Sequence, residues 1–193
     1  ICNKIRLALF NWLSYLYCYI SGVKTGKNIV FNGLPRVLRH RKSKISFGNN
    51  CIFNSAKYSV PIGPIKPCSF ITINPGSEIK LGDNVGITGS RLVAASKIEI
   101  GNNVMIGLDC SIYDTDFHKT HFFSETQNKK ILSRPVIIEE NVFIGANCII
   151  LKGVKIGRNS IIGAGSIVIN SIPDNSLAIG NPCKIVIKKQ RQL

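Results

Sequence analysis

The sequence predicts a mainly β fold, a parallel β-helix that carries a short N-terminal helical segment and one extruded loop. Two observations support this prediction. A hydrophobic-Gly-x-Asn motif recurs along the chain, and aliphatic side chains return every six residues between its copies. A six-residue period fits neither an amphipathic helix nor a hairpin strand, whereas the short strands and tight corners of a β-helix require it.

The repeat indicates where individual side chains lie. The recurring Asn occupies five positions, with Glu in place of Gly in the fourth copy: Asn50, Asn84, Asn103, Asn141 and Asn159. The longest six-residue series consists of Ile138, Ile144, Ile150, Ile156, Ile162 and Val168. We expect each aliphatic side chain to point into a prism, and the neighbouring Gly or Asn to tolerate the strained backbone of a corner. Stacked coils then bury one column of Ile, Val and Leu.

Length and composition indicate one domain. With 193 residues and 45% hydrophobic content, the chain suits a single globular domain with a small appendage. We expect a helical and basic lead-in over residues 1–44, the β-helix over residues 45–180, and a basic tail over residues 181–193. The seven cysteines show neither CxxC nor metal-ligand spacing. We therefore interpret them as reduced packing residues and expect no metal site.

The first 20 residues form an apolar segment whose partner the sequence leaves open. They are rich in aliphatic and aromatic side chains but include Lys4 and Arg6, and they barely meet the requirement of about 20 apolar residues for a spanning helix. One interpretation is a helix that packs against the prism or against a partner subunit. The other is a helix on the membrane surface, favoured by its Trp and Tyr residues. A cleaved signal peptide is not indicated, because no small-residue cleavage site is evident.

The net charge of +15 predicts attraction to polyanions. Anionic lipid, acidic polysaccharide, nucleic acid and the phosphates of coenzyme A all fit this sign. Nucleic acid is the least favoured partner, because the chain has neither a reader motif nor aromatic residues interleaved with its basic stretches. Much of the charge lies in two clusters: Arg36, Arg39, Arg41, Lys42 and Lys44, and then Lys184, Lys188, Lys189 and Arg191.

The period breaks most widely after Ile112, where we predict an extruded loop over residues 113–135 that contains two of the three histidines. Long excursions from a rigid repeat tend to carry binding and catalytic residues, because the scaffold fixes their ends. A neutral imidazole suits a general base, which makes His118 the candidate catalytic residue. In an extended chain Asp116 projects to the same side and could orient the ring, with Asp114 as the next candidate.

On these repeats the chain resembles the left-handed β-helix, hexapeptide-repeat acetyltransferases, in particular their sugar and polysaccharide O-acetyltransferase branch, over residues 45–187. The left hand of the coil is implied by this resemblance alone, since parallel crossovers are otherwise right-handed. The tripeptide Asp116-Phe117-His118 resembles the loop segment that carries the catalytic histidine in the polysaccharide branch. The resemblance therefore favours His118 over His121, the second histidine of the loop.

The segment after the loop resembles the part of these enzymes that lines the acetyl-coenzyme A groove. Small residues there let the pantetheine arm lie against the backbone, and a terminal lysine suits the phosphates of the coenzyme. One departure is Phe143, where many relatives carry Trp, and it leaves the acceptor contacts open. The resemblance implies these cofactor-binding residues: Gly145, Ala146, Gly163, Ala164, Gly165, Ser166, Pro182, Lys184 and Lys188.

The resemblance implies an acetyl-coenzyme A-dependent O-acetyltransferase that acts on a sugar hydroxyl of a bacterial surface polysaccharide or its precursor. It also implies a homotrimer whose grooves lie between adjacent prisms. We expect a cytoplasmic protein, with residues 1–20 as a means of association with the inner face of the membrane.

Three alternatives stay open. An amino-sugar N-acetyltransferase differs in its acceptor. A metal hydratase similar to γ-carbonic anhydrase needs three histidines on one zinc ion. A non-catalytic, basic scaffold of polysaccharide assembly does not bind coenzyme A.

Overall fold

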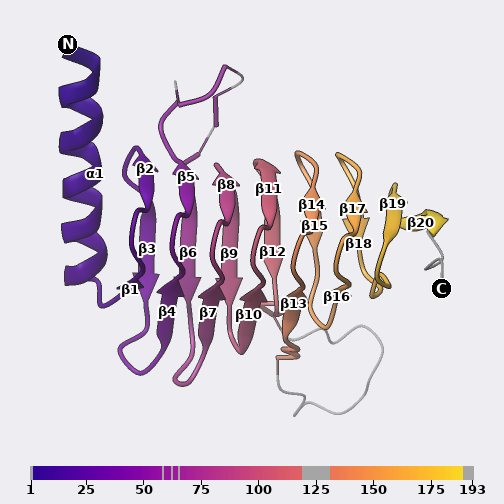
Figure 1. Cartoon of the computed structure of the whole chain (residues 1–193). Helices are drawn as coiled ribbons and strands as arrows, with labels where there is room; N and C mark the ends of the chain where they lie inside the picture. The colour runs from indigo at the N-terminus through magenta and orange to yellow at the C-terminus, as the bar shows by residue number, and fades with distance from the viewer. Residues whose placement is uncertain (1, 58, 62, 65, 119–130, 189–193) are drawn as a thin grey trace.

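Three parallel sheets wind around one prism in the structure, a computed structural model. It describes residues 2–57, 59–61, 63–64, 66–118 and 131–188, with side chains from residue 9 to residue 187 of these ranges. Each coil contributes one short strand to each sheet, and the coils follow one another in chain order from the helix at one end to the last strand at the other (Figure 1). The mainly β fold and the parallel β-helix predicted from the six-residue period are confirmed.

The strands of the described residues form three sheets, called A, B and C. Sheet A consists of β1 (Lys24–Thr25), β4 (Lys44–Phe47), β7 (Glu78–Leu81), β10 (Lys97–Ile100), β13 (Val136–Ile138) and β16 (Lys155–Ile156). Sheet B consists of β2 (Val30–Asn32), β5 (Ile52–Asn54), β8 (Gly86–Thr88), β11 (Met105–Leu108), β14 (Phe143–Ile144), β17 (Ile161–Ile162), β19 (Ser176–Ile179) and β20 (Lys184–Lys188). Sheet C consists of β3 (Arg36–Arg39), β6 (Ser69–Thr72), β9 (Arg91–Ala94), β12 (Ser111–Tyr113), β15 (Ile149–Ile150) and β18 (Ile167–Val168).

The core consists of columns of inward side chains, because parallel register stacks equivalent residues of successive coils. The six-residue series from Ile138 to Val168 is buried throughout, with exposed fractions of 0–1%, as the period predicts. Towards the N-terminal end the columns change from aliphatic to aromatic side chains, whose ring centroids lie 4.7–5.4 Å apart. Burial of this continuous apolar column is the main contribution to stability. The aromatic rings are those of Phe31, Phe47, Phe53 and Phe70.

The recurring Asn forms the corners between sheets A and B. The five predicted residues have φ values of 55–58°, a left-handed conformation that Asn tolerates better than most side chains. Their amides form a ladder, in which Asn103 accepts from Asn84 at 2.9 Å and donates to Asn141 at 3.0 Å. The glycine of the motif is required for a different structural reason from the one expected. Gly101 has no positive φ, but a Cβ there would lie 2.7 Å from Glu140 N in the next coil, so the glycine permits close stacking.

The β-helix extends beyond both boundaries expected from the sequence. Strands β1, β2 and β3 form a complete coil before residue 40, so the expected lead-in of residues 1–44 divides into a helix and the first coil. Strand β20 pairs with β19 in antiparallel register, so the expected tail of residues 181–193 contributes a strand. The first coil keeps the six-residue spacing at Thr25, Phe31 and Val37, but only Val37 of these is aliphatic, so the aliphatic series does not reveal it.

The helix α1 (Cys2–Ile20) covers the open end of the first coil. Its inward side chains pair backbone N–H groups of that coil: Asn11 Oδ1 accepts from Phe31 N, and the Tyr15 hydroxyl accepts from Ile29 N, both at 2.7 Å. These contacts protect an edge that would otherwise expose unpaired donors. The interpretation of the N-terminal segment as a helix packed on the prism is therefore confirmed.

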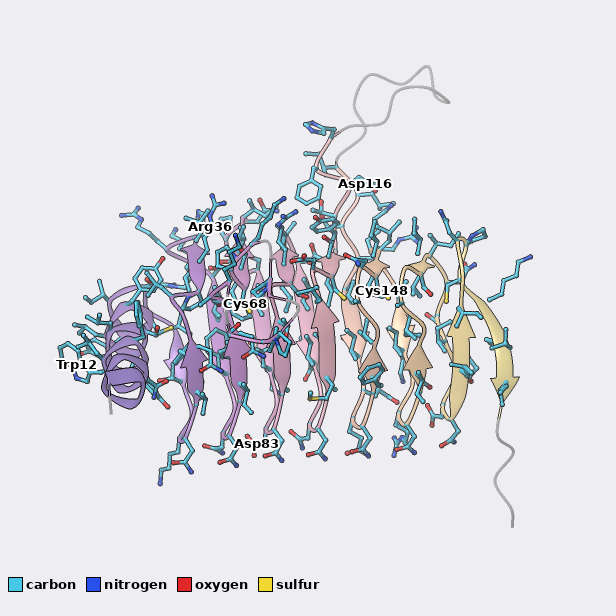
Figure 2. The ribbon with its side chains drawn as sticks, turned by 90° about the horizontal axis from the view of Figure 1, so that it is seen from above. Trp12, Arg36, Cys68, Asp83, Asp116 and Cys148 are labelled. Carbon is cyan, nitrogen blue, oxygen red and sulfur yellow. The ribbon has the colours of Figure 1, made fainter. Side chains whose placement is uncertain are left out.

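The opposite side of α1 is apolar and exposed. Trp12 is 61% exposed, and Tyr19 and Ile20 are 79% and 74% exposed. Figure 2 shows Trp12 on the side of the helix that faces away from the coils. In the part of the chain that the structure describes, no helix is both long and apolar enough to cross a bilayer.

Candidate active site

The extruded loop leaves the prism at the CA edge, the column of corners between sheets C and A. Its neck, residues 113–118 and 131–135, is a pair of arms bridged at Thr115 and Ser133. Ser133 Oγ also donates to Thr115 Oγ1 at 3.0 Å. The pairing of the two arms fixes the direction in which the chain carries His118 away from the coils.

Asp114 anchors the neck to the preceding coil. Its buried carboxylate accepts hydrogen bonds from Ala95 N and Ser96 N, each at 2.7 Å. Burial raises the pKa of Asp114, and the backbone hydrogen bonds oppose that shift. Because both carboxylate oxygens accept from this corner, Asp114 holds the neck and does not orient an imidazole.

Asp116 pairs with a lysine and not with the expected histidine. Lys152 Nζ lies 2.5 Å from Asp116 Oδ1, and the two side chains are 24% and 28% exposed. Figure 2 shows Asp116 where the neck leaves the body of the prism. The geometry therefore differs from the predicted contact between Asp116 and the ring of His118, and the ion pair instead ties the neck to the next coil.

Lys152 is not among the residues predicted from the sequence, although the repeat offers a signal for it. Parallel register places Ile112 beside Ile150 of the next coil. Counting two residues further along both strands puts Lys152 directly beside Asp114, at the base of the neck. A lysine at that position is a natural partner for a carboxylate on the loop.

His118 is exposed at the outer end of the first arm. Its backbone N donates to Asp116 O at 2.7 Å, and its imidazole makes no hydrogen bond with any described residue. Phe117 has a φ of 63°, which is rare for an aromatic side chain and is a form of strain that clusters at functional sites. The ring of Phe117 packs edge-on against Tyr113, with centroids 5.3 Å apart. His121 lies outside the described residues.

The residues predicted on the coenzyme side lie on another edge, the BC edge between sheets B and C. Gly145 and Gly163 occupy equivalent positions of adjacent coils, and a Cβ on Gly145 would lie 2.5 Å from Ala164 N. Gly165 N donates to Ala146 O at 2.8 Å. The two corners therefore stack directly, which requires the absence of side chains at these glycines.

Ala146 and Ala164 present free backbone donors on these corners. Neither N–H donates to a described residue, whereas Gly145 N donates to Ile162 O at 2.8 Å. Ala164 is exposed, and Ala146 is partly exposed. Free N–H groups on adjacent coils suit an extended ligand that carries amide carbonyls, because each backbone donor in a groove needs an acceptor.

The remaining residues predicted on this side fall into three groups. Pro182 lies in the turn between β19 and β20, Lys184 is the first residue of β20, and both are exposed. Lys188 lies in β20, opposite Ser176, and its side chain is outside the described set. Ser166 is 0% exposed, and its hydroxyl donates to Gly163 O at 2.6 Å. The Ser166 hydroxyl therefore stabilises the corner and is not available to a coenzyme.

Thiols and possible metal ligands add no further site in the described part of the chain. The six cysteines whose side chains are described are free and buried, and two of them, Cys110 and Cys148, donate to carbonyl oxygens of the BC edge at 3.0 and 3.2 Å. Among the described residues, no group of three or more His, Cys, Asp and Glu side chains could hold a metal ion.

Comparison with known proteins identifies relatives of this arrangement. The family described as the hexapeptide repeat of succinyl-transferase matches residues 135–169. The galactoside O-acetyltransferase of Lactococcus lactis is 47% identical over 96 residues, which cover 49% of this chain and 44% of that protein. The crystal structure of a maltose O-acetyltransferase from Clostridium difficile is 31% identical, covers 64% of this chain and 69% of its own, and has a TM-score of 0.50. AntD, an N-acyltransferase from Bacillus cereus, shares the fold with 21% identity, 93% and 90% coverage and a TM-score of 0.64.

The three parallel sheets, the six-residue repeat and these similarities define a left-handed parallel β-helix protein built from hexapeptide repeats. More particularly, the chain belongs to the hexapeptide-repeat acetyltransferase family, as its similarity to the maltose O-acetyltransferase shows. The chain spans about half the length of the curated relatives it matches, from 44% to 59%.

Proposed function

We propose that the protein transfers an acetyl group from acetyl-coenzyme A to a sugar hydroxyl of a bacterial surface polysaccharide or its precursor. The observation that carries this proposal is the pair of stacked corners on the BC edge, where Ala146 and Ala164 present free N–H groups on adjacent coils. The names of the relatives, galactoside and maltose O-acetyltransferase, support a sugar hydroxyl as acceptor. The exposed imidazole of His118 supports general-base chemistry.

In this mechanism His118 takes the proton of the acceptor hydroxyl, and the hydroxyl oxygen attacks the carbonyl carbon of the thioester. The oxyanion of the tetrahedral intermediate accepts a hydrogen bond from Ala146 N–H. The neighbouring amide of Gly145 already donates to Ile162 O at 2.8 Å, so Ala146 is the assigned donor. The carbon–sulfur bond then breaks, and His118 returns its proton to the departing thiolate. The products are the acetylated sugar and free coenzyme A.

We also propose that the active unit is a homotrimer. One prism carries His118 on the CA edge and the free amides on the BC edge, so a neighbouring copy is required to complete each site. The outer face of sheet B supports contact between copies, because one row across it is apolar and 43–53% exposed in the single chain. Exposed apolar rows of this extent are typical of interaction surfaces. Strand register places these residues in the row: Val30, Ile52, Met105, Phe143 and Ile161.

The outer side of α1 supports association with the inner, anionic face of the membrane. Its Trp12 and Tyr19 are side chains that favour the membrane interface, and the net charge of +15 favours anionic lipid. We expect the full chain to float with vesicles that contain anionic phospholipid, and Trp12→Ser with Leu16→Ser to abolish flotation. Equal flotation of this double variant and the wild type would exclude the helix as the membrane contact.

His118→Ala tests the catalytic assignment. General-base assistance is typically worth about 10²- to 10⁴-fold, and we expect turnover to fall by roughly this factor. Coenzyme A is expected to raise the melting temperature of the variant as it does that of the wild type. His40→Ala is the matched control, because His40 lies in the first coil and accepts a hydrogen bond only from Lys42 N on its ring. A His118→Ala enzyme with wild-type turnover would remove His118 from the mechanism.

The alternatives predict other outcomes of the same assays. If the protein acetylates an amino sugar in preference to a sugar hydroxyl, it is an N-acetyltransferase and the proposed O-acetylation is wrong. No change of the melting temperature with coenzyme A would favour the non-catalytic scaffold, since a ligand specific for the native state must stabilise that state.

A further inference from the structure

A groove of about 550 Å³ lies on the outer face of sheet A, over its first four strands. The face is formed by outward side chains in two rows, because successive residues of a strand alternate between core and solvent. One row contains Lys24, Ser46 and Lys80, and the second contains Lys44, Glu78 and Lys97. Arg39 and Gly22 close the side of the groove next to α1.

The lining of this cationic groove is unbalanced in charge. Five cationic side chains and one carboxylate, Glu78, line it. Lys80 and Lys97 share Glu99, with Nζ to oxygen distances of 3.1 and 2.6 Å. Lys24 and Lys44 form no ion pair with a carboxylate in the described ranges. The register puts Ser46 or Glu78 between the lysines of each row, so the excess of positive charge belongs to the groove as a whole, and a bound anion would neutralise it.

The part of sheet A farther from α1, around β13 and β16, has balanced charges, unlike the groove. Lys155 Nζ lies 2.7 Å from Glu139 Oε1, and Arg158 lies between Glu139, Glu140 and Asp174 at 3.5–3.8 Å. The positive charge is therefore a local property of the groove and not of sheet A as a whole.

Arg39 is held in place before any ligand arrives. Its Nε donates to Ser21 O and its Nη1 donates to Ser43 O, both at 2.8 Å. A Cβ on Gly22 would lie 2.5 Å from Arg39 Nη2, so the absence of a side chain at Gly22 leaves space for the guanidinium. A guanidinium held in this way suits phosphate, because less side-chain entropy is lost when the anion binds.

The groove ends beside the neck of the extruded loop. Lys97 follows Ala95 and Ser96, whose N–H groups both donate to Asp114 at 2.7 Å. Ile98 also pairs with Val136, the first residue of β13 after the loop. An anion in the groove therefore lies along the same edge of the same chain as the segment that carries His118.

We propose that the cationic groove binds the phosphate groups of a phosphate-linked saccharide and so holds the acceptor on the chain that carries His118. This inference rests on the proposed acetyl transfer to a sugar. The sugar of such an acceptor extends from the groove towards the neck, and the shared chemistry of its sources, a nucleotide sugar or a lipid-linked sugar, is a phosphate or diphosphate next to the sugar.

The first test measures the binding of inorganic diphosphate to the full chain by calorimetry, with the donor site saturated by coenzyme A. Lys24→Gln with Lys44→Gln is expected to weaken diphosphate binding roughly tenfold or more, since hydrogen bonds to charged groups are the stronger ones. Lys155→Gln, a lysine on the balanced half of sheet A, is the matched control and is expected to bind as the wild type does. Equal binding by all three proteins would overturn the proposal.

The second test separates this proposal from the proposed function. Acetylation is measured with a nucleotide-linked sugar, a lipid-diphosphate-linked sugar and the corresponding free sugar. We expect one linked sugar to be preferred, and the double variant to raise its KM about tenfold while kcat and coenzyme A binding stay unchanged. If the free sugar is preferred while coenzyme A is still bound and turned over, the groove does not bind the acceptor phosphate. The proposed acetyl transfer would not be affected by that result. Absence of coenzyme A binding would instead remove the proposed function.

Discussion

Complementation between two inactive variants tests whether neighbouring chains share each site. His118→Ala removes the imidazole from the CA edge. Ala164→Trp fills the BC edge from an exposed position, where the larger side chain does not enter the core. Each variant alone is expected to be inactive, because every cleft of its homotrimer lacks one of the two halves.

The expected recovery follows from the arrangement of the two edges. Each cleft combines the CA edge of one chain with the BC edge of the next chain around the ring. In a hybrid trimer with one chain of one variant and two of the other, a cleft is intact when the first chain keeps His118 and the next chain keeps Ala164. A cyclic trimer of either composition contains one such cleft, so about one third of wild-type activity is expected. If one chain formed the whole site, no cleft would be intact in any hybrid.

The assay needs hybrids free of homotrimers. Two affinity tags, one on each variant, allow co-expressed hybrids to be isolated by successive purification, and a thiol reagent then measures the release of coenzyme A. Homotrimers of the two variants, purified separately and mixed just before the assay, are the control. Hybrids no more active than this mixture would refute the division of the site between chains.

Three further predictions concern the fold and the assembly. Asn103 has a φ of 56°, so Asn103→Ala is expected to cost about 1–2 kcal/mol more than Asn103→Gly in urea denaturation, and equal losses would contradict the conformational argument. Asp114→Asn leaves Ala95 N or Ser96 N unpaired, at a cost of about 1–3 kcal/mol. Because burial raises the pKa of Asp114 above 3.8, the wild type loses stability as pH rises from 3.8 through the raised pKa; acid thermal melts of the variant should lack this slope. Phe143→Asp is expected to give folded monomers in sedimentation velocity, and a stable trimer would exclude the apolar row on sheet B as the interface.

The inward half of this structure could be predicted from the sequence, because the repeat specifies it at every step. Each position of the series from Ile138 to Val168 is buried, and each recurring Asn occupies a left-handed corner. The first coil keeps the six-residue spacing at Thr25, Phe31 and Val37, but it was missed because only Val37 of these three residues is aliphatic. Composition alone does not distinguish such a coil from a basic lead-in.

The site was harder to predict, because its contacts depend on register between coils. In an extended chain Asp116 and His118 project to the same side. In the structure Asp116 forms its ion pair with Lys152, one coil further on. Ser166 is a small polar residue of the kind expected in the coenzyme groove, yet its hydroxyl is buried and donates to Gly163 O. The partner of Asp116 is distant in the sequence and adjacent in the stack, which a local pattern does not represent, whereas Ser166 bonds within its own corner.

A six-residue period lets one prism carry chemically different surfaces. The inward position is constrained in every coil, whereas the outward positions are constrained by solvent or by a partner. Because neighbouring coils are about 4.8 Å apart, an outward residue type that recurs at one position becomes a continuous stripe. Sheet A carries the cationic groove that contains Lys24 and Lys80, and sheet B carries the apolar row that contains Phe143. An apolar row that joins copies leaves the cationic groove open to solvent, so the same repeat that builds the core can divide assembly and acceptor binding between two faces.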